Sequence, residues 1–213
     1  MAMRRAGPEQ WFFDVWSRFY DARLVQRITY RPEHDAVLRR LRPVAPGRVL
    51  DVACGTGLLV SRIQRELPQA HVVACDFSRG MLEQASGNRR AAALVQASAL
   101  ALPFAACSFD ALVTTEAFHW FPDQAQALRE FRRVLAPGGR IFVSLVNPPL
   151  EVMADAGRWL SRLAGEPARW PTRRQMRRLA EGAGFEVESQ SLVLRVPATL
   201  VLPSILTVAV RGD

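Results

Sequence analysis

The stretch Val49-Leu50-Asp51-Val52-Ala53-Cys54-Gly55-Thr56-Gly57 begins as a short apolar strand, ends that strand in an acid, and continues into a glycine-rich turn. Residues 58–65 then have apolar side chains at helical intervals, and a second apolar strand at residues 71–75 leads into Asp76. This order predicts a nucleoside-binding βαβ unit. The glycines let the backbone turn sharply and approach a ligand, and an acid after the second strand can accept bonds from both ribose hydroxyls.

The residues around the loop narrow the choice of nucleoside. A dinucleotide fingerprint reads G-x-G-x-x-G or G-x-G-x-x-A, whereas the third small position here is Val60. Asp51, just before the loop, would repel a pyrophosphate but would suit a cationic amino group. A ligand with a ribose, an amine and a carboxylate fits better, and S-adenosylmethionine is such a ligand.

With these residues the chain resembles the Rossmann-like (class I) S-adenosylmethionine-dependent methyltransferases, whose first motif reads like LDVACGTG. It most resembles the small-molecule branch that includes the quinone-biosynthesis enzymes. Further matching pieces are Asp76-Phe77-Ser78 with Met81-Leu82, Leu102-Pro103-Phe104, Ser108-Phe109-Asp110 and residues 133–139. The resemblance implies an α/β fold with a seven-stranded, mainly parallel sheet, helices on both faces, one antiparallel strand near the end, and an N-terminal helical lid.

Periodicity and turn residues predict the elements outside this unit. Helices are predicted at residues 9–30, 32–42, 79–85, 123–135, 151–164 and 172–183, and strands at 92–96, 108–115, 140–146, 185–189 and 200–210. Residues 136–139 are predicted to form a tight turn, and the alternation of strands and helices predicts a mainly parallel sheet.

Length and composition suggest one domain over residues 1–213, and the resemblance implies that it is a methyltransferase domain. We expect a lid at 1–46, a cofactor-binding core at 47–147, and substrate-side helices and final strands at 148–213. No uninterrupted apolar stretch is long enough to cross a bilayer, and the N-terminus has no apolar run behind its arginines, so we expect a cytoplasmic protein. Three widely spaced cysteines without a C-x-x-C pair predict neither disulfides nor a metal site.

The net charge of +8 would ordinarily suggest an acidic partner. The chain contains no lysine, however, and the abundance of arginine and alanine looks like the bias of a GC-rich genome. Arg173, Arg174, Arg177 and Arg178 are therefore interpreted as a solvated helix face, with binding to anionic lipid or nucleic acid as the alternative. Asn147-Pro148-Pro149-Leu150 is interpreted as a strand-ending turn, because the similar motif of amino-methylating nucleic-acid enzymes follows the fourth strand and ends in an aromatic residue.

The resemblance assigns roles to individual residues. Those expected around the methionine end of the cofactor are Asp51, Ala53, Gly55 and Gly57, with Thr115 and Tyr20 also expected at the cofactor. Asp76 is expected to bind the ribose hydroxyls by charge-assisted bonds, and Phe77 and Met81 to pack against the adenine. Ser98 departs from the family, since many relatives carry an acid there that accepts from the adenine amino group; the Ala99 N–H can still contact the ring.

The loop after the fourth strand lies beside the transferring methyl group in the resembling family. His119 in this loop is the one histidine placed to act as a general base, and its alternative role is that of a pocket-wall or structural histidine. Aromatic residues of the N-terminal helices, including Trp11, Trp16 and Phe19, could line an apolar acceptor pocket or simply pack the lid.

The leading hypothesis is methyl transfer from S-adenosylmethionine to a small, partly apolar acceptor, with S-adenosylhomocysteine as the other product. Methylation of RNA or protein is an alternative that the charge motivates, although no nucleic-acid-binding module is recognisable. A cofactor-binding protein without transfer activity is a second alternative, motivated by Ser98 and by the absence of an obvious base. A nicotinamide oxidoreductase is disfavoured by Val60. The acceptor atom and the oligomeric state cannot be inferred from the sequence.

Overall fold

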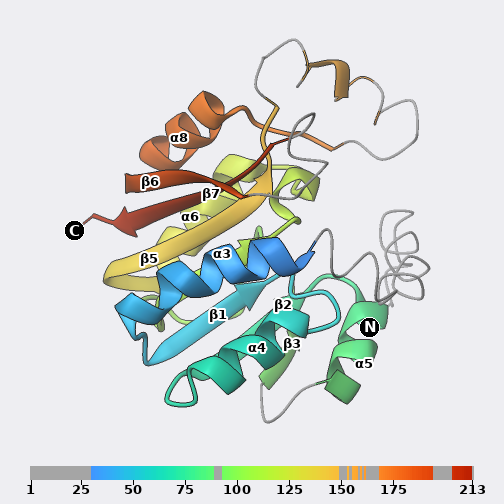
Figure 1. The fold of residues 1–213 in the computed structure, drawn as a ribbon, viewed down its shortest axis with the longest axis vertical. Helices are drawn as coiled ribbons and strands as arrows, with labels where there is room; N and C mark the ends of the chain where they lie inside the picture. The colour runs from blue at the N-terminus through green and yellow to red at the C-terminus, as the bar shows by residue number, and fades with distance from the viewer. Residues whose placement is uncertain are drawn as a thin grey trace, which may run out of the picture.

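The computed structural model describes residues 30–88, 93–148, 153, 155–157, 159, 161, 168–193 and 203–212. Its centre is a seven-stranded sheet with the order β3-β2-β1-β4-β5-β7-β6 (Figure 1). The strands are β1 (Arg48–Val52), β2 (His71–Asp76), β3 (Ala93–Gln96), β4 (Phe109–Thr115), β5 (Leu135–Val146), β6 (Phe185–Val193) and β7 (Ser204–Arg211). The helices are α3 (Arg31–Leu41), α4 (Leu58–Glu66), α5 (Arg79–Asn88), α6 (Gln124–Val134) and α8 (Arg173–Gly182), with short 3-10 turns η2 (Arg42–Val44) and η3 (Phe118–Trp120).

Strand pairing confirms the expected topology. The first five strands run parallel, with Val49 of β1 opposite Val72 of β2 on one side and opposite Ala111 of β4 on the other. The last strand, β7, lies between β5 and β6 and is antiparallel to both. The fold is therefore an α/β, Rossmann-like, mainly parallel sheet with the antiparallel strand near its end, as predicted.

Helices cover both faces of the sheet (Figure 1). On one face, α3 and α4 bury apolar side chains such as Leu41 and Ile63 against the strand residue Phe142. On the other face, α6 and α8 bury Phe131 and Met176 in a second apolar cluster. Burial on both faces explains why the central strands are almost continuously apolar, as in other parallel sheets.

Two helices begin at the caps that their sequences provide. The Asp123 side chain accepts a hydrogen bond from the Gln126 N–H at 2.9 Å, at the start of α6. Thr172 and Gln175 form a reciprocal capping box at the start of α8. The start of α8 therefore matches the predicted boundary, and the described residues of segment 151–164, at 153, 155–157, 159 and 161, are helical.

The predicted turn at residues 136–139 lies inside a strand in the structure. β5 is assigned from Leu135, five residues before the predicted start, and pairs with β4 at Phe109. The register then shifts, so that Ala111 pairs with Arg140 and the intervening residues bulge out around Gly138, whose φ is +73°. The glycine allows the sharp local change of direction, and the strand continues on both sides of it.

Other predictions fall partly outside the described residues. Residues 9–29 of the first predicted helix, which include Tyr20, are outside the described residues. Residues 200–202, at the start of the last predicted strand, are outside them as well. Among the helices that the structure describes, none is both long enough and apolar enough to cross a membrane.

Candidate cofactor and acceptor site

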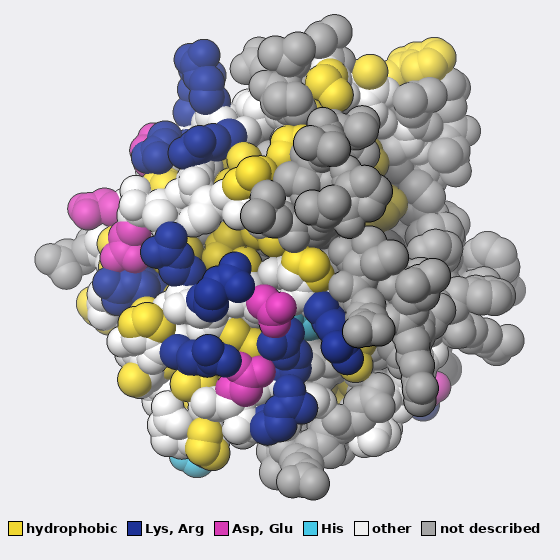
Figure 2. All heavy atoms as spheres, in the orientation of Figure 1, with side chains coloured by type: hydrophobic (Ala, Val, Ile, Leu, Met, Phe, Trp, Pro, Cys, Tyr) yellow, Lys and Arg dark blue, Asp and Glu magenta, His cyan; other side chains and the backbone are white. Residues whose placement is uncertain are grey.

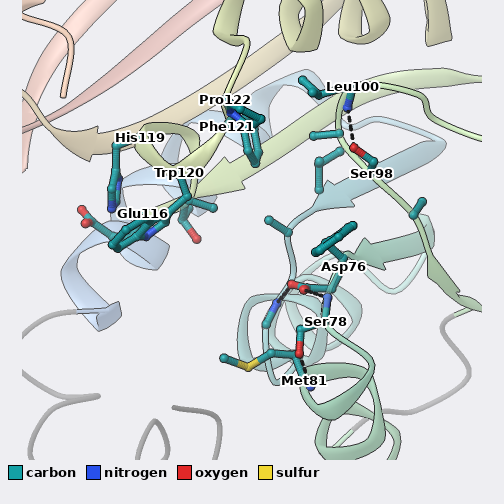
Figure 3. A pocket seen from close by; sticks show the side chains of 18 of the residues that line it. Asp76, Ser78, Met81, Ser98, Leu100, Glu116, His119, Trp120, Phe121 and Pro122 are labelled. Carbon is teal, nitrogen blue, oxygen red and sulfur yellow. Dashed lines mark hydrogen bonds between the residues drawn. The ribbon is translucent and has the colours of Figure 1, made fainter. Parts of the chain in front are cut away.

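A cavity of about 510 Å³ lies at the carboxyl ends of the parallel strands (Figure 3). Four segments form its wall, residues 52–55, 76–78, 97–100 and 115–122, together with Tyr30 and Met81. Within these segments, Cys54 and Phe118 do not line the cavity. These segments follow β1, β2, β3 and β4, and the strand order changes direction between β1 and β4. Open α/β sheets bind ligands at this kind of position.

The glycine-rich loop after β1 has an unusual backbone. Ala53, Gly55 and Gly57 have φ angles of +58°, +55° and +76°. A Cβ atom at Gly57 would lie 3.2 Å from the Ala85 Cβ of α5, so this glycine also allows close packing of two helices. The left-handed conformation at Ala53 costs about 1–2 kcal/mol in a residue that has a Cβ, which explains why glycine suits this position.

Asp76 links this loop to the end of β2. Its Oδ2 accepts a hydrogen bond from the Gly55 N–H at 2.8 Å, and its Oδ1 accepts one from the Ser78 N–H at 2.9 Å. The carboxylate is 9% exposed and lines the cavity. An ionised carboxylate can accept several hydrogen bonds, so this group is suited to hydroxyl donors of a ligand.

Asp51 is buried at the end of β1, with an exposure of 1%. Its Oδ2 has no hydrogen-bond partner among the described residues. Burial, and then the nearby charge of Asp76, raise the pKa of this carboxyl well above its usual range. A cationic group bound close by would favour the ionised form, as the sequence analysis expected for the amino group of the ligand.

The segment after β3 forms the opposite side of the cavity from α5. The Ser98 hydroxyl accepts a hydrogen bond from the Leu100 N–H at 3.2 Å, which leaves its own proton available to donate elsewhere. Phe77 is 49% exposed, Met81 is 4% exposed, and both line the cavity. A flat ring could lie here between apolar side chains and the polar edge of residues 97–99.

The far end of the cavity is aromatic. His119 lies on η3 with its ring centroid 4.9 Å from Trp120 and 5.2 Å from Trp170, on which it stacks at 20°. The His119 backbone carbonyl accepts a hydrogen bond from the Arg169 N–H at 2.8 Å, which joins residues 168–172 to this turn. The stacking and the backbone bond together fix the imidazole in the cavity wall.

The His119 imidazole is uncharged at neutral pH. It is 6% exposed, its Nδ1 has no hydrogen-bond partner among the described residues, and burial lowers its pKa to about 3. A base whose pKa is this low accepts a proton poorly, because catalytic efficiency falls as the pKa departs from the working pH. The ring suits a hydrogen-bonding role better, and the base role remains a prediction.

Glu116 is a cavity residue for which no individual role was predicted from the sequence. It follows β4 directly, has a φ of +52°, and donates its N–H to the Ser144 carbonyl of β5 at 2.7 Å. Its Oε1 accepts a hydrogen bond from the Ser204 hydroxyl of β7 at 3.4 Å. An acid directly after a parallel strand was a signal for a site residue, as it was for Asp76.

Most residues predicted for the site line one cavity. Those that do are Ala53, Gly55, Asp76, Phe77, Met81, Ser98, Ala99, Thr115 and His119. Asp51 and Gly57 are not part of its wall and lie below the loop surface, and Tyr20 lies outside the described residues. Within the described ranges no cluster of three His, Cys, Asp or Glu side chains could hold a metal ion, and the cysteines are free thiols.

A seven-stranded sheet with a glycine loop after β1 and an acid after β2 defines the Rossmann-like class of nucleoside-binding domains. Residues 50–143 match a family model described as a methyltransferase domain. The chain therefore carries a methyltransferase domain of the class I (Rossmann-like) kind over residues 50–143.

Sequence relatives agree with this match, and a solved structure agrees with the fold. The chain is 44% identical over 109 residues to a demethylmenaquinone methyltransferase of Thermus thermophilus, covering 49% of this chain and 50% of that protein. It is 34% identical over 108 residues to a malonyl-[acyl-carrier protein] O-methyltransferase of Legionella pneumophila, covering 49% and 38%. The match thus spans half or less of the length of these curated relatives. A methyltransferase structure from Thermotoga maritima has a TM-score of 0.72, 22% identity, and coverage of 95% and 98%.

Proposed function

We propose that this protein transfers a methyl group from S-adenosylmethionine to a small, partly apolar acceptor and releases S-adenosylhomocysteine. The observation that carries the proposal is the Asp76 carboxylate, which is fixed by the Gly55 and Ser78 N–H groups at the cavity wall. A ribose offers a pair of hydroxyl donors that such an acceptor can bind. The names of the sequence relatives support the same reaction.

The residues present fit this cofactor. Asp76 would bind the ribose, Phe77 and Met81 would contact the adenine, and Ser98 and Ala99 would face its polar edge. The unpartnered oxygen of buried Asp51 suits the ligand's amino group near the glycine loop. Thr115, at the end of β4, would border the cofactor where the cavity turns toward Glu116 and His119.

When bound, S-adenosylmethionine supplies a methyl group that is already activated by a positively charged sulfur. The chain's own contribution is then mainly to position the acceptor and to exclude water. Residues 115–117 and 119–120 provide a wall for this purpose, in which His119 is held by stacking on Trp170. A cavity of about 510 Å³ falls in the range of small-molecule sites.

The chemistry of the cavity wall supports a partly apolar acceptor. Away from Asp76, the apolar and aromatic wall residues include Leu100, Phe121, Pro122, Trp120 and Tyr30, and they lie beside the polar Glu116 and His119. We propose that residues 1–46 cover this end as a lid, that 47–147 bind the cofactor, and that 148–213 complete the acceptor side. We further propose a cytoplasmic location, with peripheral membrane contact as an option for an apolar acceptor.

Methylation of RNA or protein is less well supported. Figure 2 shows arginine side chains over α3 and α4 with acidic side chains among them. Several of these form ion pairs, such as Arg42 with Glu66 and Arg62 with Glu66. On α8, Arg177 pairs with Glu181. This mixed surface is typical of a solvated face, and a polyanion would find fewer unpaired cations than the net charge suggests.

The test is calorimetric titration with S-adenosylmethionine and S-adenosylhomocysteine, for the wild type and for Asp76→Ala. We expect the wild type to bind both ligands and Asp76→Ala to bind them much more weakly. Asp110→Ala, which removes a half-exposed acid that pairs with Arg48 at the other end of β1, serves as the control. Absence of binding by the wild type would contradict the proposal, and binding without methyl transfer to any acceptor would favour the alternative of a cofactor-binding protein.

A further inference from the structure

A second cavity, of about 580 Å³, lies away from the cofactor cavity, between the second half of α6, residues 182–184 and the end of β7. Because β7 runs antiparallel to β5, its end lies beside the start of β5 and far from the carboxyl ends of the parallel strands (Figure 1). Among the described residues, the two cavities have no wall residue in common. The second cavity is therefore a separate feature of the fold.

Arginine side chains dominate the wall of this second cavity. Arg129, Arg132 and Arg133 come from α6 at i, i+3 and i+4 spacing, Arg211 comes from β7, and no acidic residue is among the described wall residues. Like charges at these helical spacings repel one another. The negative end of a helix favours cations in its last turn, which accounts for Arg132 and Arg133 but not for Arg129.

Two of the four guanidinium groups are bonded into the fold. Arg133 forms an ion pair with Glu130 at 2.8 Å and donates to two backbone carbonyls. Arg132 donates from its Nε to the Gly184 carbonyl at 3.4 Å. A Cβ atom at Gly184 would lie 2.7 Å from this Nε, and φ there is +83°, so glycine allows the Arg132 guanidinium to lie in the wall.

The guanidinium groups of Arg129 and Arg211 have no acidic partner among the described residues. Arg129 is exposed and donates to the amide oxygen of Gln126 at 2.9 Å. Arg211 donates to the Leu135 carbonyl and, at 3.3 Å, to the Cys107 thiol, while its buried Nε has no hydrogen-bond partner in the described part of the chain. Since a guanidinium carries five N–H donors, both groups have donors left for a ligand.

We propose that this cavity binds a compact oxyanion with two or more negative charges, of the phosphate and pyrophosphate kind. A guanidinium presents its N–H groups in a planar fork that matches two oxygens of a phosphoryl group, and bonds between such charged groups are stronger than neutral ones. Arg129 and Arg211 come from different elements, so an anion with several oxygens can bridge them. Arg132 and Arg133 add to the positive potential of the wall.

An extended polyanion fits the surroundings less well. A nucleic acid gains its affinity from many cations along its backbone. On α8, next to the cavity, Arg177 is paired with Glu181, and Arg133 in the wall itself is paired with Glu130. The positive charge that is free of acidic partners is thus local, which favours a small anion.

The test is calorimetric titration of the full chain with inorganic pyrophosphate at low salt. We expect the wild type to bind it at a single site. Arg129→Gln should weaken binding by at least about fivefold, and because Arg129 is exposed this variant should fold normally. Arg211→Lys keeps the charge but loses the planar fork, so it should weaken binding by at least about threefold.

Arg174→Gln is the matched control. Arg174 is exposed on α8 and does not line the cavity, and its replacement removes the same unit of charge. Its dissociation constant should stay within about twofold of the wild type. Absence of pyrophosphate binding would overturn the proposal. Equal weakening by Arg174→Gln and Arg129→Gln would also overturn it, because the attraction would then come from the net charge of +8 and not from a site.

Cys107 reports whether the anion lies in this cavity. Its thiol is exposed and bonded to Arg211, whereas Cys75 is buried and Cys54 is partly buried. Pyrophosphate at saturation should slow the reaction of Cys107 with the uncharged reagent 4,4′-dithiodipyridine by at least about threefold, because the bound anion restricts access to the thiol. Cys107→Ser should lack this reaction. An unchanged rate at saturation would place the anion elsewhere and overturn the proposal.

Phenyl phosphate distinguishes two sources of the same chemistry. Binding as tight as that of inorganic phosphate would assign the site to phosphate esters as well, whereas binding at least about tenfold weaker would assign it to the free inorganic anion; both results require the site to exist. S-adenosylmethionine is absent from all these titrations. Failure of the proposed methyl transfer would therefore leave this proposal standing, and the converse holds.

Discussion

The Asp76 carboxylate accepts a hydrogen bond from the Gly55 N–H at 2.8 Å, and so joins the loop after β1 to the end of β2. The other carboxylate oxygen accepts from the Ser78 N–H, so one side chain organises both segments. Asp76→Asn keeps the shape but can accept only through its carbonyl oxygen. We expect a loss of about 1–3 kcal/mol in the free energy of unfolding, together with weaker S-adenosylhomocysteine binding.

Urea unfolding and calorimetry measure the two effects of Asp76→Asn separately. Glu83→Gln on α5, which breaks an exposed pair with Arg79, should change neither quantity noticeably. Unaltered binding in a folded Asp76→Asn protein would contradict the role of Asp76 at the ribose.

Asp51 should make the ligand-free protein less stable as the pH rises. Its pKa is raised in the folded state, so the folded protein holds this proton at pH values where the unfolded chain has released it. The stability that Asp51 contributes is therefore full below the ordinary aspartate pKa and is lost as the pH rises toward the raised value. Asp51→Asn should then stabilise the ligand-free protein at pH 7 by roughly 1–3 kcal/mol.

Denaturant unfolding of the wild type and Asp51→Asn at pH 4 and pH 7 measures this difference. The gain should be smaller at pH 4, and S-adenosylmethionine should bind Asp51→Asn more weakly, because the charge that suits its amino group is missing. A gain of equal size at both pH values would show that the carboxyl does not titrate in this range.

His119 should contribute a stability that acid removes. Its pKa falls from 6.5 to about 3 on folding, so between these values the unfolded chain binds a proton that the folded protein does not. The free energy of unfolding should therefore fall by up to about 1.4 kcal/mol for each pH unit below 6.5 on account of this group. His119→Gln should remove that part of the slope, whereas His71→Gln, at an exposed strand start, should not.

The same variant tests the base role. If His119 only positions the acceptor, His119→Gln should lower kcat by less than about tenfold, whereas loss of a general base costs roughly 10²- to 10⁴-fold. A fall in that larger range, with unchanged cofactor binding, would make the imidazole the base despite its low pKa.

The sequence predicted the parallel core well because its signals are local. The run from Val49 to Gly57 combines an apolar strand with two glycines, and their positive φ angles are what the loop requires. Asp76 was found in the same way, as an acid at the end of an apolar strand. Such signals depend on neighbours in the chain, and the pairing of β1 with β2 and β4 follows from the alternation of elements.

The acceptor end was less predictable because it depends on contacts that are distant in sequence. His119 was considered as a base, but burial lowers its pKa, and the Trp170 ring on which it stacks lies about fifty positions away in the sequence. The place of Glu116 directly after β4 was a local signal, but its orientation depends on Ser144 and Ser204 of two other strands. The continuation of β5 through residues 136–139 likewise required the pairing with β4.

Gly57 should tolerate no side chain. Alanine there would adopt a φ of +76° and place its Cβ 3.2 Å from the Ala85 Cβ. We expect Gly57→Ala to lower the free energy of unfolding by about 1–3 kcal/mol. Adding Ala85→Gly would relieve the contact but leave the backbone cost, so the double variant should recover only in part.

Gly87→Ala is the control for this series, because no atom lies within 4 Å of a Cβ placed there and its φ is not positive. It should leave the protein as stable as the wild type or slightly more stable, by up to about 1 kcal/mol. Full recovery in the double variant would show that the backbone angle costs nothing.

Ser98 should be the residue that limits how well the adenine is held. Its hydroxyl accepts from the Leu100 N–H at 3.2 Å, and an aspartate at this position could keep that bond while offering an ionised acceptor to the adenine amino group. Because bonds to a charged acceptor are stronger than neutral ones, Ser98→Asp should tighten S-adenosylhomocysteine binding by about 1 kcal/mol, or roughly fivefold. S-inosylhomocysteine, which has a carbonyl oxygen in place of the exocyclic amino group, should bind Ser98→Asp no better than it binds the wild type. Calorimetry with both ligands distinguishes the possibilities. Equal tightening of the binding of both ligands would mean that the new carboxylate acts on the loop. No tightening of the binding of either ligand would mean that the adenine amino group does not lie at Ser98.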